Sequence, residues 1–545
     1  MKRKPLHPND PLLHSDHSRP RSRRDFLRYG MLAGSGAVLG PSLLGLLASQ
    51  PAHALSPEVR ALIDEASCSV GTAAGNNKAI PFICFDLAGG ANITGSNVLG
   101  GGPDGQLDFL SSAGYSLQGL PGDMAPSASS TPDTQLVNDE LGLIFHADSG
   151  FLRGILEKAP TAEGNINGAI IPARSDNDTG NNPHNPMYAI HRVGQAYNDA
   201  MNADAPRFGQ LLGLIGSRST DSGGNSIAPP LLVDPTLRPT KIDRPSDATG
   251  LVDTGKLVGL LNQADAVATM ETMARISHLK LNRVSTRLPD DETIKYLIKC
   301  GYVKSADLAE QFGNPSDLDP DLDADIVGPT GIFSEEEWTG RNRGEYQKTA
   351  SVMKLVVNRH AGAGTITMGG FDYHTGERAT GEFRDLRAGR CIGACLEYAA
   401  LKGQPLMVYV FSDGSVFSNG MTDDSEGGGG KGVWTGDNSG TAASFFLVYN
   451  PNGRPQSTNP IESEKGTQIG YFRPDGSVET GSSPAANNVN LLVNTVALNY
   501  LALHDGYVGR GGNEFQTLGL SLNDLLPNHG LGNDLGDLIA LNPII

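Results

Sequence analysis

The chain has 545 residues, a formal net charge of −18 at pH 7 and 69 glycines. Its length accommodates one large domain or two ordinary ones. Because nucleic-acid phosphates require a basic face on their partner, the acidic balance argues against a nucleic-acid-binding protein.

The first 54 residues have the layout of a bacterial export signal. Basic residues lead to Ser22-Arg23-Arg24-Asp25-Phe26-Leu27, residues 29–54 contain no charge, and Ala52-His53-Ala54 fits a cleavage site before Leu55. The paired arginines match the twin-arginine signal. The apolar run is short and interrupted by glycines and a proline, which makes an uncleaved anchor the weaker alternative. We therefore predict a twin-arginine signal peptide at 1–54, folded export through the twin-arginine translocase to the periplasm or beyond, and no stable membrane span after cleavage.

Five cysteines follow in the rest of the chain, with no C-x-x-C pair that would indicate zinc or redox chemistry. Cys391 and Cys395 are four residues apart on an expected helix and so share one of its faces. Buried thiols are the expectation, and one disulfide stays open, with partners that the sequence does not assign.

Two short strands are expected in the first half of the chain. Residues 79–87, AIPFICFDL, form a continuous apolar run, typical of a strand covered on both faces. Residues 167–173, NGAIIPA, predict a second strand that leads into a long polar loop. Apolar positions at helical spacing then predict a helix from Pro186.

Residues 195–355 carry a pattern of helices and loops, which predicts an insertion or cap on the sheet domain. Within it, five aspartates alternate strictly from Asp317 to Asp325. The glycine and glutamate that a calcium loop requires at its sixth and twelfth positions are missing. A solvated acidic loop is therefore the default expectation, with a calcium site as the alternative.

The segment from 353 to 450 has the strand, loop, helix, strand rhythm of a parallel sheet. The expected elements are strands at 365–370, 405–411 and 443–449, a helix near 383–402, and a later helix at 488–503. The chain is therefore expected to belong to the α/β class.

Three of these strands run directly into a carboxylate: Asp86, Asp372 and Asp413. Ligands bind at the carboxyl ends of parallel strands, and acids gathered there repel one another unless a cation or a shared proton offsets the charge. His374 follows Asp372 by two residues and in an extended segment points to the same side. Each aspartate alone is also a common turn former or helix cap. The set with the histidine predicts a divalent metal site, zinc or manganese if the histidine binds and calcium or magnesium if only oxygens do.

The order of these motifs resembles that of a large family of twin-arginine-exported bacterial proteins with an alkaline-phosphatase-like (sulfatase-like) core. The resemblance rests on FDLAGG-x-N, on GGFDYH and on the Phe-Ser-Asp-Gly loop, and it covers roughly 79–195 and 353–450. It implies a three-layer sandwich around a mostly parallel sheet. Residues 55–545 would form this single domain, with the helical insertion at about 195–355.

The resemblance also implies a set of site residues. Asp86 matches the family's first-strand acid, and Asp372 with His374 matches its Asp-x-His segment. Asp413 stands where the family has a glutamate. Asn438, in Asp437-Asn438-Ser439-Gly440, replaces a histidine ligand and is a weak metal candidate.

Other positions depart from the family pattern. Asn92 stands where an acid is usual, and Pro183-His184 replaces a Ser-His pair. The family's nucleophile is a serine, threonine or cysteine, so Thr179 and His184 are left as weak catalytic candidates.

Two functions of different classes follow. The first is an exported metal-dependent hydrolase of a phosphate or sulfate ester, in which the metal polarises the ester and activates a nucleophile or water. The second is a non-catalytic binding or assembly protein of the cell envelope that keeps the fold with a degenerate site. The missing nucleophile, Asn92 and Asn438 favour the second function, and the Asp-x-His segment favours the first.

Overall fold

A computed structural model of the chain describes residues 56–59, 61, 79–127, 136–175, 184–201, 213–217, 239–252, 263–288, 291–312, 315–458, 467–508 and 514–545. All of them belong to one compact unit, Leu55–Ile545. The predicted signal peptide at 1–54 and Thr179 lie outside the described residues. None of the described helices has the length and apolar character needed to cross a membrane.

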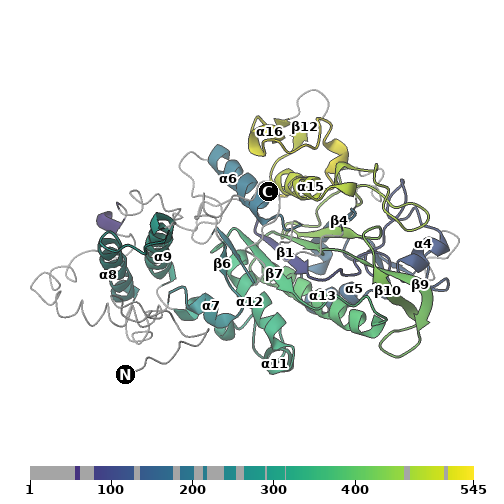
Figure 1. Cartoon of the computed structure of the whole chain (residues 1–545), viewed down its shortest axis with the longest axis horizontal. Helices are drawn as coiled ribbons and strands as arrows, with labels where there is room; N and C mark the ends of the chain where they lie inside the picture. Colours follow the sequence, from purple (N-terminus) through teal and green to yellow (C-terminus); the bar gives the residue numbers. More distant parts are fainter. Residues whose placement is uncertain are drawn as a thin grey trace, which may run out of the picture. The chain divides into compact units, whose positions relative to one another are not determined.

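A seven-stranded sheet forms the centre of this unit, with the strand order β4-β11-β8-β1-β7-β5-β6 (Figure 1). The strands are β1 (Phe82–Leu87), β4 (Ile166–Pro172), β5 (Leu214–Gly216), β6 (Thr240–Lys241), β7 (Ala363–Met368), β8 (Leu406–Phe411) and β11 (Ala443–Tyr449). Within this sheet β11 alone runs antiparallel to its neighbours. The predicted α/β class with a mostly parallel sheet is confirmed.

The continuous apolar runs become central strands because both faces of the sheet are covered. Alternate side chains of β1 enter different cores: Ile83 and Phe85 enter one, and Phe82 and Cys84 enter the other. The first core is closed by α5 (Gly150–Lys158), α12 (Arg343–Val357) and α13 (Arg378–Leu401), and the second by α6 (Met187–Met201) and α15 (Val489–Ala502) (Figure 1). Helices on both faces of the sheet make three layers.

Helices α5 and α13 pack closely through small residues. A Cβ added at Gly389 would lie 2.2 Å from the Phe151 carbonyl oxygen, and one added at Gly154 would lie 2.4 Å from that of Leu386. Any larger residue at these glycines would separate the helices. The close packing holds α13 against the sheet, and α13 begins next to the candidate site.

Part of the predicted insertion at 195–355 belongs to the sheet domain itself. Strands β5 and β6 extend the sheet beyond β7, and α12 covers one of its faces. These strands are three and two residues long, too short to produce a periodic pattern in the sequence. The remaining helices of the segment include α7 (Pro245–Thr249) and the pair α8 (Gln263–Leu281) and α9 (Asp291–Phe312), which pack against each other.

The alternating aspartates form side-chain contacts with neighbouring elements. Asp323 accepts from Lys354 at 2.7 Å and from the Tyr398 hydroxyl at 2.8 Å. Asp325 lies 2.6 Å from Lys402, and Asp321 accepts from the indole of Trp338 at 2.7 Å. This part of the chain is therefore anchored to helices α12 and α13, whereas a solvated loop was expected.

A β-hairpin follows β8, between the predicted strands at 405–411 and 443–449, where the sequence analysis predicts no strand. It consists of β9 (Val416–Asp423) and β10 (Lys431–Asp437), paired as a separate two-stranded sheet. Polar residues and glycines conceal these strands from an apolar pattern. The shorter elements are α4 (Ser112–Leu117), β2 (Val137–Asn138), β3 (Phe145–His146), α10 (Pro315–Leu318), α11 (Glu335–Thr339), β12 (Tyr507–Val508), β13 (Glu514–Phe515), β14 (Leu520–Ser521) and α16 (Leu522–Leu525).

The free cysteines of the described residues are Cys84, Cys391 and Cys395, and all three are buried, as expected. Burial raises the pKa of the Cys84 and Cys391 thiols to about 12, which keeps them protonated and unreactive. Cys300 on α9 is disulfide-bonded.

Candidate metal centre

The loops that follow β1, β7 and β8 meet at one edge of the sheet because these parallel strands are neighbours. Gly89, after β1, donates its N–H to Asp413 Oδ1 at 2.7 Å. Its φ is +122°, and an added Cβ would lie 2.4 Å from the Asp372 backbone nitrogen. Only glycine accommodates both this conformation and this approach. The FDLAGG segment thus brings the three strand ends together.

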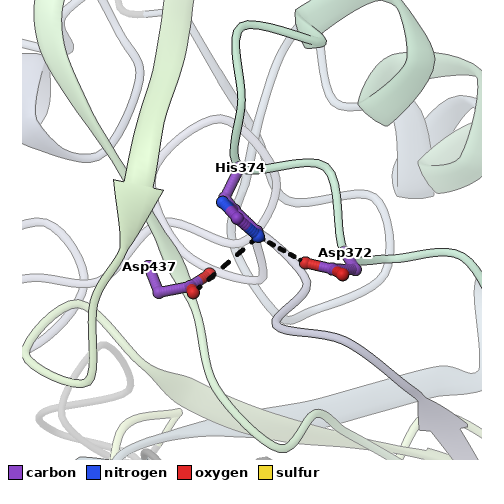
Figure 2. Close-up of side chains that lie close together, drawn as sticks. All are labelled: Asp372, His374 and Asp437. Carbon is purple, nitrogen blue, oxygen red and sulfur yellow. Dashed lines mark ion pairs between the residues drawn. The ribbon is translucent and has the colours of Figure 1, made fainter.

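Two carboxylates and one imidazole converge at this edge. His374 Nε2 lies 2.7 Å from Asp372 Oδ1 and 3.8 Å from Asp437 Oδ2. Figure 2 shows the imidazole between the two carboxylates. Asp372 and His374 lie in the loop between β7 and α13, and Asp437 is the last residue of β10. One ligand atom from each residue falls within 4.8 Å of the others.

The geometry of this group suits a small divalent cation. Two ligands each about 2.1 Å from a tetrahedral ion lie roughly 3.4 Å apart, and the two observed separations lie on either side of that value. A nitrogen with two carboxylate oxygens suits zinc or manganese better than calcium or magnesium. The side chains of Asp372 and Asp437 are 66% and 68% exposed and that of His374 is 31% exposed, so the centre is open to solvent on one side.

Of the residues predicted from the sequence, Asp372 and His374 belong to this group. Asp86 and Asp413 do not belong to it, although both lie at the same edge of the sheet. Asp86 is buried and accepts from the Thr367 hydroxyl at 3.3 Å, and Asp413 accepts the Gly89 N–H.

Asn438 also stays outside the group, and its neighbour Asp437 takes part instead. Asn438 Oδ1 accepts from the Gly440 N–H at 2.6 Å, so its amide stabilises the turn after β10. Asp437 is a fourth carboxylate directly at the end of a strand. The same criterion that identifies Asp372 would have selected Asp437, had β10 been recognised.

His184 lies away from this group in the buried layer on the α6 side of the sheet. It shares a hydrogen bond with the Ser175 hydroxyl and stacks on Phe411, with 6.5 Å between ring centroids. Burial lowers the pKa of His184 to about 4, so the ring is neutral at physiological pH. These contacts fit a structural histidine, and none of them reaches the three converging residues.

A buried hydrogen-bond network anchors the residue between the two loop ligands. The Tyr373 hydroxyl donates to Asp385 Oδ1 at 3.1 Å and accepts from the Asn92 N–H at 2.8 Å. Asn97 Nδ2 donates to Asp385 Oδ2 at 2.8 Å. Because Tyr373 is fully buried, Asp372 and His374 on either side of it are directed outward together. Burial raises the pKa of Asp385 to about 7, and the nearby Glu382 adds to the effect.

A second network anchors the hairpin that carries Asp437. Arg378 is fully buried, pairs with Glu382 at 2.6 Å and lies 4.5 Å from the centre of the Trp434 ring. Lys431, at the start of β10, pairs with Glu382 at 2.8 Å. The first turns of α13 therefore hold both ligand-bearing segments. Apart from the four-residue spacing of Arg378 and Glu382, nothing in the sequence pattern indicates this network.

Comparisons with family models, curated proteins and solved structures find no match to the chain. The resemblance to the alkaline-phosphatase-like family therefore rests on the sequence motifs alone. In that resemblance Asp372 and His374 belong to the Asp-x-His segment, and Asp437 directly precedes Asn438, the residue expected to replace a histidine ligand.

Proposed function

We propose that Asp372, His374 and Asp437 bind a divalent cation, zinc or manganese, and that the protein is an exported metal-dependent hydrolase of phosphate or sulfate esters. The observation that carries this proposal is the convergence of the three side chains at the carboxyl edge of parallel strands, where α/β proteins bind their ligands. The Asp-x-His motif and the export signal in the sequence also support it.

The three converging residues and their neighbours would have different roles in binding the cation. Asp372 and Asp437 supply the negative charge, and His374 supplies a nitrogen ligand between them. Tyr373 and the Arg378 network hold these ligands at their spacing before a cation arrives. A cation held there would act as a Lewis acid toward an ester oxygen and would lower the pKa of a bound water. Three protein ligands leave a coordination position for that water or the substrate.

A non-catalytic binding or assembly protein of the cell envelope is the second candidate. This candidate is favoured because residues that would complete a phosphatase-like site make other contacts. His184 is engaged with Ser175, and Asn438 stabilises its own turn. No serine, threonine or cysteine side chain of the described residues hydrogen-bonds to Asp372, His374 or Asp437, so no nucleophile is identified beside them.

Metal content and ester hydrolysis distinguish the two candidates. Purified exported protein is analysed for bound metal and assayed with p-nitrophenyl phosphate and p-nitrophenyl sulfate. Asp437→Asn is compared with Asp123→Asn, a control at an exposed aspartate outside the centre. We expect about one metal ion per chain, lost together with hydrolysis in Asp437→Asn alone. Stoichiometric metal without hydrolysis would favour the binding protein, and absence of stoichiometric metal would contradict the metal centre.

A further inference from the structure

The guanidinium of Arg384 lies against the backbone two residues before Asp372. A Cβ added at Gly370, whose φ is +92°, would lie 3.0 Å from Arg384 Cζ and 3.2 Å from both Nε and Nη2. Three nearly equal distances mean that the flat face of the guanidinium covers this glycine. The absence of a side chain at position 370 therefore lets Arg384, from the second turn of α13, reach the loop.

The exposure pattern of that loop relates Gly370, against which Arg384 lies, to the two candidate ligands. Gly370 and Asp372 are exposed and His374 is partly exposed, whereas Phe371 and Tyr373 between them are fully buried. Gly370 thus belongs to the same outward-facing set of positions as the two ligands. The guanidinium of Arg384 thus lies against an exposed position of the loop, two residues before Asp372.

Arg384 differs from Arg378 and Arg390 of the same helix in its partners. Arg378 pairs with Glu382 at 2.6 Å, and Arg390 pairs with Glu157 at 2.7 Å. Within the part of the chain that the structure describes, no carboxylate or other acceptor bonds to the Arg384 guanidinium, which is only partly exposed. Its N–H donors are available to a ligand. A guanidinium presents them as a planar fork that matches two oxygens of a phosphate or sulfate group.

The net charge of the cation-loaded centre indicates what Arg384 contributes to the site. The two carboxylates of the centre balance the charge of a divalent cation, so the loaded centre has no net positive charge. Arg384 adds the positive charge that an anionic ester requires. We infer that Arg384 is the anion-recognition residue of the proposed site and binds the phosphoryl or sulfuryl oxygens of the substrate beside the cation. This inference rests on the proposed function.

Binding of inorganic phosphate tests the inference without relying on catalysis. The full-length exported protein is loaded with zinc or manganese, and phosphate affinity is measured by isothermal titration calorimetry. Arg384→Gln is expected to weaken phosphate binding roughly 10- to 100-fold, the usual contribution of hydrogen bonds to a charged group. Metal affinity should stay unchanged, because Arg384 is not a metal ligand. Arg473→Gln, which removes a surface ion pair with Glu479, is the control and should leave both affinities unchanged.

Gly370→Ala provides a second variant that leaves the arginine in place. The added methyl group would crowd the guanidinium at 3.0–3.2 Å and would strain the backbone at a φ of +92°, so the guanidinium should shift and phosphate binding should weaken in this variant also. Sulfate, tested as a competitor, separates the two ester classes. Unchanged phosphate affinity in both variants, or no phosphate binding by metal-loaded wild type, would overturn the inference. A wild-type protein that binds no metal would instead contradict the proposed function.

Discussion

Two acidic regions of the molecule differ in whether lysines of the chain pair with their carboxylates. Asp323 and Asp325, from the alternating run of aspartates, each have a lysine partner, Lys354 and Lys402. Among the described residues, the ion-pair partner of Asp372 and Asp437 is the imidazole of His374, which they share. Two of the five aspartates in the run that looks most like a cation site in the sequence are thus paired with lysines of the protein. Carboxylates that are far apart in the sequence are the ones that we propose bind an external ion.

The largest expected effect comes from breaking the internal neutralisation. The side chains of Lys354 and Asp323 are 9% and 10% exposed, so Lys354→Met would leave a nearly buried carboxylate without its cation, with hydrogen bonds from the Tyr398 hydroxyl and the Asp325 N–H. We expect a loss of about 3–5 kcal/mol in the free energy of unfolding, measured by urea denaturation. Lys402→Met, at the more exposed pair with Asp325, is the matched control and should cost about 0–1 kcal/mol. Equal effects of the two variants would contradict the comparison.

The same pair predicts a response to acid. Burial opposes the charged form of Asp323, but the hydrogen bonds from Lys354 and Tyr398 outweigh it and lower the pKa of this carboxyl. A carboxyl with a lowered folded-state pKa stabilises the fold above its ordinary pKa, about 3.9, and the contribution disappears as pH falls through the lowered value. The stability difference between wild type and Asp323→Asn should therefore shrink below about pH 4. A difference that stays constant down to pH 2 would contradict this assignment.

The anchor of the metal centre should have a smaller effect on stability and a clear effect on metal binding. Tyr373→Phe removes the hydroxyl between the Asn92 N–H and Asp385, which leaves buried groups unpaired at a cost of about 1–3 kcal/mol. Residues that orient metal ligands typically change metal affinity roughly 10- to 100-fold. Zinc titration of Tyr373→Phe is compared with Tyr471→Phe, a control outside this network. A stability loss with unchanged zinc affinity would show that Tyr373 supports the fold but does not position the ligands.

The Asp385 carboxyl behind this tyrosine predicts a response in the opposite pH direction. Because burial raises its pKa to about 7, this carboxyl stays protonated in the folded state while it ionises in the unfolded state, so the fold loses stability as pH rises from about 4 to 7. Wild type should lose stability over this range relative to Asp385→Asn, which does not ionise. Thermal melts of both proteins between pH 5 and pH 8 measure the difference. Parallel profiles for the two proteins would contradict the role of Asp385.

The smallest effect on stability is expected at the ligands themselves. Asp372 and Asp437 are largely exposed, so Asp437→Asn should change the free energy of unfolding of the metal-free protein by less than about 0.5 kcal/mol. Zinc at 100 times its dissociation constant should stabilise wild type by about 2.7 kcal/mol and should not stabilise the variant. Equal stabilisation of both proteins by zinc would place the ion elsewhere.

The features that the sequence predicts are those that depend on residues close together in the chain. The runs of β1 and β8 are continuously apolar because both faces of each strand are buried, and this signal lies within each strand. Asp372 and His374 lie two residues apart, so their convergence is also local. Asp437 comes from a polar hairpin without an apolar pattern, and for that reason the sequence favoured Asn438 through the resemblance.

The rest depends on contacts between distant parts of the chain. Lys354 of α12 pairs with Asp323, which lies outside that helix. The guanidinium of Arg378, at the start of α13, lies over the ring of Trp434 in β10. Neither pairing leaves a trace in residue spacing. The position of Arg384 depends on a glycine fourteen residues earlier, and only the folded loop shows that the two meet.

The most direct test of the metal centre is anomalous diffraction from crystals grown with zinc or manganese. One anomalous peak is predicted within about 2.0–2.2 Å of His374 Nε2 and of one carboxylate oxygen from each of Asp372 and Asp437. Crystals of Asp437→Asn under the same conditions should lack the peak. A peak at Asp323 or Asp325, or no peak at the three ligands in wild type at saturating metal, would contradict the account.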